Sequence, residues 1–88
     1  MLRVSFHRNF RKDYRKLPER MKRRVKERIA LFCKDPFDPI LRNHALAGKF
    51  RRYRSIDISG DLRVVYAPIG ENIVEFVLIG THHDLYGN

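Results

Sequence analysis

The stretch YRSIDISGDLRVVY, residues 53–66, predicts a β-hairpin. Two runs rich in β-branched and aromatic residues flank residues 59–61, Ser-Gly-Asp, a sequence typical of a tight turn. A two-residue loop over Ser59 and Gly60 would mix polar and apolar side chains on both faces. A three-residue loop over 59–61 separates them. We expect the second register, because a slip by one residue turns all the side chains of a strand to the opposite face.

The expected register places a carboxylate beside a guanidinium. It pairs Ile58 with Leu62, Asp57 with Arg63, and Ile56 with Val64. The apolar members of these pairs, together with Tyr66, then form the face that meets the core, while Asp57 and Arg63 share the other face. An exposed pair of this kind contributes only about 0.2–1 kcal/mol. The pair is therefore of interest for catalysis and not for stability.

The segments around the hairpin predict a single α+β domain over residues 1–88. We expect a strand over 2–6, an αα-hairpin over 7–34 that breaks at Leu17-Pro18, a connection over 36–48, a second turn at 67–72, a strand over 73–79 and a polar tail over 80–88. This order, β-α-α-β-β-β, is typical of a mostly antiparallel sheet packed on a helical pair. The single cysteine, Cys33, excludes an internal disulfide. Without a signal peptide or a membrane-spanning apolar run, we expect a cytoplasmic location.

The net charge of +9 is concentrated in the N-terminal part of the chain. Residues 1–34 hold thirteen Lys and Arg against three acids, whereas residues 35–88 hold six against seven. This excess of positive charge is larger than solvent-exposed helix faces require. It favours a polyanionic partner, such as a nucleic acid.

Residues that could take part in catalysis lie at loops and strand ends of the C-terminal half. They are His44, Asp57, Asp61, Arg63, His82, His83 and Tyr86. A meander can bring these segments together at one end of the sheet. Histidine suits proton transfer because its unperturbed pKa is ~6.5, and arginine matches two phosphate oxygens. The histidines and aspartates lack the paired spacing of zinc sites, and the serines lack a nucleophile elbow, so neither kind of site is expected.

Four segments carry a family pattern: His44-x-Leu46-x-Gly48, Tyr53-Arg54, Asp61-x-Arg63-Val64-Val65-Tyr66 and Gly80-Thr81-His82-x-x-Leu85-Tyr86-Gly87. Together they resemble the RelE/ParE toxin superfamily, and most closely the YafQ-like branch of bacterial toxin–antitoxin ribonucleases. The resemblance implies a small sheet under an N-terminal helical hairpin. It also implies metal-independent and cofactor-free mRNA cleavage on the ribosome, and a cognate antitoxin as protein partner.

The resemblance also implies roles for particular residues. His44, Asp61 and His82 match positions of the YafQ-like site, Tyr86 falls on its C-terminal aromatic residue, and Arg63 matches an arginine of RelE-like members. The chain departs from the pattern twice: Asp57 stands where YafQ-like toxins carry a second catalytic histidine, and Leu62 replaces a tryptophan.

Cleavage of this kind begins with attack of the RNA 2′-hydroxyl on the adjacent phosphate. We expect His82 as the general acid, His44 or Asp57 as the base, Arg63 as the phosphate clamp and Tyr86 as a stacking or orienting group. Asp57 has a second interpretation, as an ion-pair partner that only orients Arg63. The cations expected to contact RNA or the ribosome are Arg20, Arg23, Arg24, Lys26, Lys49, Arg51, Arg52 and Arg54.

Two other functions fit a small basic domain. One is a ParE-like inhibitor of DNA gyrase, which shares the fold but lacks the histidines. The other is a nucleic-acid-binding module that uses its helical hairpin as a helix-turn-helix. His44 and the Gly-Thr-His82 motif favour the ribonuclease over the gyrase inhibitor. The Leu17-Pro18 turn and the two Phe-rich faces suit a core-packed hairpin better than a recognition helix.

Overall fold

The computed structural model describes residues 2–86, with the backbone alone for Tyr86. Its helices are α1 (Arg8–Arg15), α2 (Glu19–Lys34) and α3 (His82–Tyr86), with short 3₁₀ helices η1 (Pro39–Leu41) and η2 (Gly48–Phe50). Its strands are β1 (Arg3–Phe6), β2 (His44–Ala45), β3 (Arg54–Ser59), β4 (Leu62–Gly70) and β5 (Ile73–Thr81). The expected α+β order is confirmed, with the short β2 and α3 as additions.

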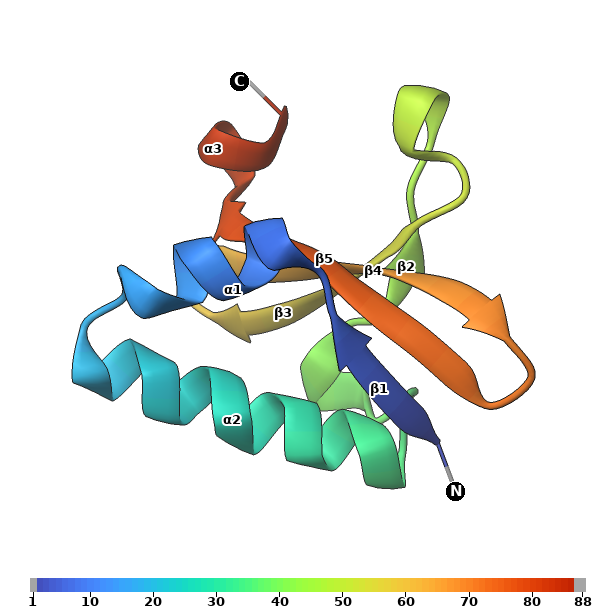
Figure 1. The fold of residues 1–88 in the computed structure, drawn as a ribbon, viewed down its shortest axis with the longest axis horizontal. Helices are drawn as coiled ribbons and strands as arrows, with labels where there is room; N and C mark the ends of the chain where they lie inside the picture. The colour runs from blue at the N-terminus through green and yellow to red at the C-terminus, as the bar shows by residue number, and fades with distance from the viewer. Residues whose placement is uncertain (1, 87–88) are drawn as a thin grey trace.

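The five strands form one sheet in the order β1-β5-β4-β3-β2. β1 runs parallel to β5, and all other neighbours are antiparallel. The hairpin of α1 and α2 packs on the sheet through Phe10, Val25 and Phe32, which join the buried strand residues in one core. α3 and the connection from β2 to β3 project from the sheet on the side away from α2 (Figure 1).

The β3–β4 hairpin confirms most of the expected register. Asp57 pairs with Arg63, and Ile56 pairs with Val64. The expected pairing of Ile58 with Leu62 is wrong, because Leu62 pairs with Ser59 and the register shifts between Asp57 and Ser59. This β-bulge keeps Ile58 in the core, 2% exposed, while it shortens the turn to two residues. Gly60 permits the tight turn with a left-handed φ of +52°.

Two expectations outside this hairpin are corrected. The second turn is tighter than 67–72, since β4 continues to Gly70 and Asn72 takes a left-handed φ of 57° that asparagine tolerates. The expected polar tail over 80–88 instead completes β5 and forms α3 within its described part. Thr81 and Asp84 explain the helix, because the Asp84 N–H donates to Thr81 Oγ1 (3.0 Å) and the Thr81 N–H donates to Asp84 Oδ2 (3.2 Å). This reciprocal pair is a capping box.

Candidate active site

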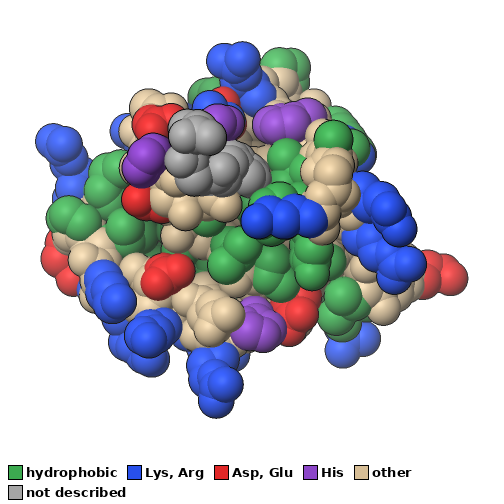
Figure 2. All heavy atoms as spheres, turned by 90° about the horizontal axis from the view of Figure 1, so that it is seen from above, with side chains coloured by type: hydrophobic (Ala, Val, Ile, Leu, Met, Phe, Trp, Pro, Cys, Tyr) green, Lys and Arg blue, Asp and Glu red, His purple; other side chains and the backbone are tan. Residues whose placement is uncertain are grey.

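A cleft at one end of the sheet brings three of the predicted site residues together. It measures about 210 Å³ and is lined by His44, Leu46, Ala47, Phe50, Arg63 and His82. β2 carries His44, β4 carries Arg63, and α3 begins at His82. The segments that are distant in sequence therefore meet as the meander predicts. Histidine side chains gather near the top of the molecule in the view from above (Figure 2).

Asp57 lies beside this cleft and holds Arg63. Arg63 donates from a terminal nitrogen to Asp57 Oδ1 at 2.9 Å, and the two side chains are only 24% and 17% exposed. The buried Nε of Arg63 has no hydrogen-bond partner among the described residues. A half-buried, direct pair of this kind fixes the guanidinium more firmly than a surface pair does.

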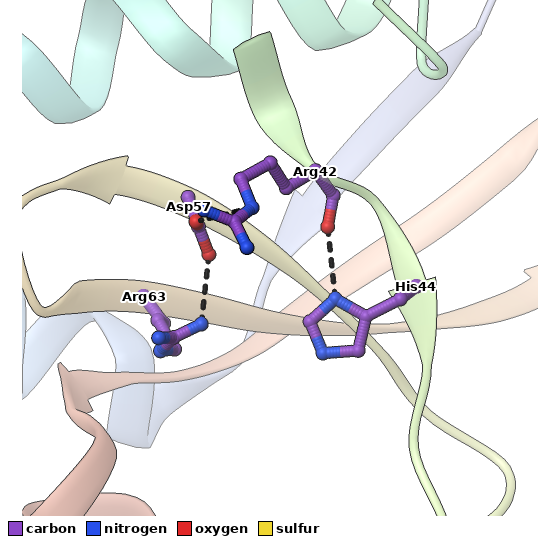
Figure 3. Close-up of polar contacts among 4 residues, drawn as sticks. All are labelled: Arg42, His44, Asp57 and Arg63. Atoms are coloured by element: carbon purple, nitrogen blue, oxygen red, sulfur yellow. Dashed lines mark hydrogen bonds and ion pairs between the residues drawn. The ribbon is translucent and has the colours of Figure 1, made fainter. Parts of the chain in front are cut away.

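Arg42 does not line the cleft, but it faces Asp57 beside it, and the sequence analysis missed it. Its Nε lies 3.6 Å from Asp57 Oδ2, so two guanidinium groups share one carboxylate (Figure 3). Arg42 ends the η1 turn in the left-handed conformation, with φ 48° and ψ 46°. The sequence does signal the turn, because Asp38 caps it through the Ile40 N–H (3.0 Å) and Pro39 occupies its first position. Nothing in the sequence signals that an arginine ends it.

The backbone of Arg42 determines which nitrogen of His44 carries the proton. His44 Nδ1 lies 2.8 Å from the Arg42 carbonyl oxygen (Figure 3). A carbonyl oxygen only accepts hydrogen bonds, so Nδ1 must be the donor. In the neutral ring Nε2 then keeps its lone pair, which is the form that a general base requires.

Asn43 ties the loop before β2 to the core. Its Nδ2 donates to the Tyr66 hydroxyl (2.8 Å) and to the Pro36 carbonyl (2.8 Å), while its Oδ1 accepts from Arg54 Nε (2.9 Å). The Arg54 guanidinium also lies 5.4 Å from the centre of the Phe37 ring. Arg54, predicted to contact RNA, is therefore engaged within this loop.

The remaining candidate residues are Asp61, His83 and Tyr86. Asp61 is exposed in the β3–β4 turn and is not among the residues that line the cleft. His83 is exposed on α3. Tyr86 ends α3, and its side chain lies outside the described part of the chain.

The hydrogen bonds from Thr81, first from its backbone N–H and then from its hydroxyl, lower the pKa of the nearby Asp84 carboxyl.

Apart from Arg54, the predicted RNA-contacting cations fall into two groups. Lys49, Arg51 and Arg52 are exposed beside Phe50, which lines the cleft. Arg20, Arg23, Arg24 and Lys26 are exposed on α2, on the other side of the sheet from α3 and η2 (Figure 1). Only the first group therefore lies near the cleft.

Between residues 2 and 86 there is no group of three or more His, Cys, Asp or Glu side chains placed to hold a metal ion. Within the same span, no helix combines the length and the apolar character needed to cross a membrane.

This chain is similar to known bacterial toxins in sequence and in structure. The sequence model of a family described as "Bacterial toxin of type II toxin-antitoxin system, YafQ" matches residues 2–87. No curated protein matches the chain. Among solved structures, YafQ from E. coli is 21% identical with a TM-score of 0.81, and the alignment covers 99% of this chain and 100% of that one. YafQ in the E. coli DinJ-YafQ toxin-antitoxin complex is 23% identical with a TM-score of 0.80, covering 99% and 100%. A copper-bound mutant toxin from Helicobacter pylori is 26% identical with a TM-score of 0.75, covering 98% and 100%.

Proposed function

This chain belongs to the YafQ family of bacterial toxins of type II toxin–antitoxin systems, and we propose that it acts as a ribosome-dependent mRNA endoribonuclease. The observation that carries the proposal is the convergence of His44, Arg63 and His82 on one small cleft. Cleavage assisted by the RNA 2′-hydroxyl needs a base, an acid and positive charge. These three side chains are of the types that supply them.

In the proposed reaction, His44 Nε2 takes the proton of the 2′-hydroxyl, and the 2′-oxygen attacks the adjacent phosphorus. The bond from phosphorus to the 5′-oxygen breaks, and His82 donates a proton to this leaving oxygen. Arg63 stabilises the charge that develops on the phosphate oxygens. The products are a 2′,3′-cyclic phosphate and a 5′-hydroxyl end.

We assign the base to His44 rather than Asp57. The bond between His44 Nδ1 and the Arg42 carbonyl supports this choice, because it leaves Nε2 as the acceptor. The two oxygens of Asp57 each face an arginine, at 2.9 and 3.6 Å. Asp57 therefore serves as a positioning residue for Arg63, which accounts for a carboxylate at this position in place of the histidine of YafQ-like toxins.

The proposal includes two macromolecular partners. A cognate antitoxin is expected because a related toxin is found in the DinJ-YafQ toxin-antitoxin complex. The ribosome with its mRNA is the expected target, which places the activity in the cytoplasm. The exposed cations of α2 and of the segment around η2 would provide the attraction to ribosomal RNA, which weakens with salt.

The test is primer extension on a reporter mRNA after induction of the protein in bacteria. We expect cuts that require translation and that disappear in His82→Ala. His83→Ala is the matched control, because His83 is adjacent and exposed but does not line the cleft. Growth arrest without any cleavage would overturn the proposal and favour the ParE-like inhibition of gyrase. Cleavage that persists in His82→Ala would retain the activity but remove His82 as the acid.

A further inference from the structure

We propose that Arg42 is a second phosphate-binding residue, whose guanidinium leaves Asp57 and binds the RNA phosphate when substrate enters the cleft. This inference rests on the proposed function, which otherwise assigns the phosphate to Arg63 alone. It concerns a residue outside the four segments that carry the family pattern.

The two arginines on Asp57 are held very differently. Arg63 makes a direct hydrogen bond of 2.9 Å and is 24% exposed. Arg42 lies at 3.6 Å, beyond hydrogen-bond distance, and its side chain is 79% exposed. A solvated ion pair at this separation contributes little, so Arg42 loses little when it turns away from Asp57. Arg63 remains on the carboxylate as the fixed partner.

The backbone keeps Arg42 close to the proposed base. Its carbonyl oxygen lies 2.8 Å from His44 Nδ1, and its left-handed φ of 48° is a conformation in which glycine or asparagine is the usual residue. Non-glycine residues in this region persist where the surrounding structure holds them, and they concentrate at functional sites. Arginine at this position places an exposed guanidinium close to the ring that would take the 2′-hydroxyl proton.

The net charge of the site is suited to a second phosphate-binding arginine. Asp57 neutralises one of the two guanidinium charges, so the free site carries about one positive charge when both histidines are neutral. The transition state of 2′-hydroxyl attack adds negative charge to a phosphate that already carries one. A second guanidinium matches this increase, because arginine binds phosphate oxygens through two parallel donors.

The direct test is an NMR titration of the full chain with a 2′-O-methylated RNA trinucleotide, which carries phosphates but cannot be cleaved. The variants are Arg42→Gln and, as control, Arg3→Gln on β1 at the opposite edge of the sheet. Both remove one positive charge. Glutamine keeps the β-carbon, so the backbone at position 42 and its bond to His44 stay comparable.

We expect the trinucleotide to shift the Nε–H signal of Arg42 and to bind Arg42→Gln about tenfold more weakly than wild type. Arg3→Gln should change the affinity by less than about twofold. An unmoved Arg42 signal, or equal losses of affinity in the two variants, would overturn the proposal.

A ribosome cleavage assay provides the second measurement. Arg42→Gln should lower the rate at saturating ribosome concentration by about 10²-fold, while Arg3→Gln should change only the concentration needed for saturation. An unchanged saturated rate in Arg42→Gln would overturn the proposal. If wild type cleaves no RNA, the proposed function fails, and the titration still decides whether Arg42 binds phosphate.

Discussion

Asn43 donates a hydrogen bond of 2.8 Å to the hydroxyl of Tyr66, a core residue that is only 3% exposed. The contact joins the core directly to the residue before His44. Because β2 is only two residues long, its own pairing with β3 provides little rigidity. The position of the proposed base therefore depends on a side-chain bond to the core.

Tyr66→Phe tests this dependence. The change leaves one Asn43 donor without its partner, and we expect a loss of about 1 kcal/mol in the free energy of unfolding, measured with urea. We also expect a lower cleavage rate, because the loop that carries His44 loosens. Tyr14→Phe is the control, since its hydroxyl makes a longer bond, 3.4 Å to the Lys22 carbonyl, within the helical hairpin. Equal cleavage rates in wild type and Tyr66→Phe would show that Asn43 has no positioning role.

A comparison of His44→Asn with Asp57→Asn distinguishes base from positioning residue. Asparagine at position 44 keeps a donor for the Arg42 carbonyl but lacks the nitrogen that accepts the proton. We expect it to lower the cleavage rate by about 10²–10⁴-fold.

Asp57→Asn should instead lower the rate by only about tenfold, through a less well oriented Arg63. If Asp57→Asn lowered the rate by about 10²–10⁴-fold and His44→Asn by only about tenfold, the roles would be reversed and Asp57 would be the base.

The hairpin shows which part of the structure the sequence predicts well. Alternation of apolar and polar residues is a local signal, and it correctly placed Asp57 opposite Arg63. The bulge at Ile58 was not predicted, because a three-residue loop and a bulge with a two-residue turn both leave Ile58 in the core. The hydrophobic pattern therefore could not distinguish them.

The candidate site was harder to predict from the sequence than the hairpin. The Thr-x-x-Asp spacing at the start of α3 is a sequence signal for the capping box of Thr81 and Asp84, yet the sequence analysis expected only a polar tail there. The contact of Arg42 with Asp57 was not readable. It depends on a left-handed arginine at the end of η1 and on a pairing across fifteen residues, and neither has a local signal.

Acid should loosen α3 through Asp84. The bonds from Thr81 lower the pKa of this carboxyl in the folded chain. Its stabilising contribution is therefore complete above the unfolded pKa and is lost as the pH falls through the lower folded value. We expect faster amide exchange in α3 over this acidic range, followed by NMR together with the Asp84 carboxyl signal.

Thr81→Ala removes the hydroxyl that bonds Asp84. It should raise the pKa of Asp84 part of the way back, since the backbone bond remains, and Thr81→Ser should leave that pKa unchanged. An Asp84 pKa that is the same in wild type and Thr81→Ala would show that the hydroxyl does not stabilise the carboxylate.

The cations of α2 should serve docking and not chemistry, because α2 lies on the other side of the sheet from α3 and η2 (Figure 1). Replacing Arg23, Arg24 and Lys26 together with glutamine should weaken ribosome binding and reduce its dependence on salt. The cleavage rate at saturating ribosome concentration should stay within about twofold of wild type, since the cleft is untouched. The matched variant replaces Lys49, Arg51 and Arg52, which flank the cleft residue Phe50, and should lower the saturated rate as well. Unchanged ribosome affinity of the α2 variant at physiological salt would contradict the docking role, and a fall in its saturated rate would show that α2 contributes to catalysis.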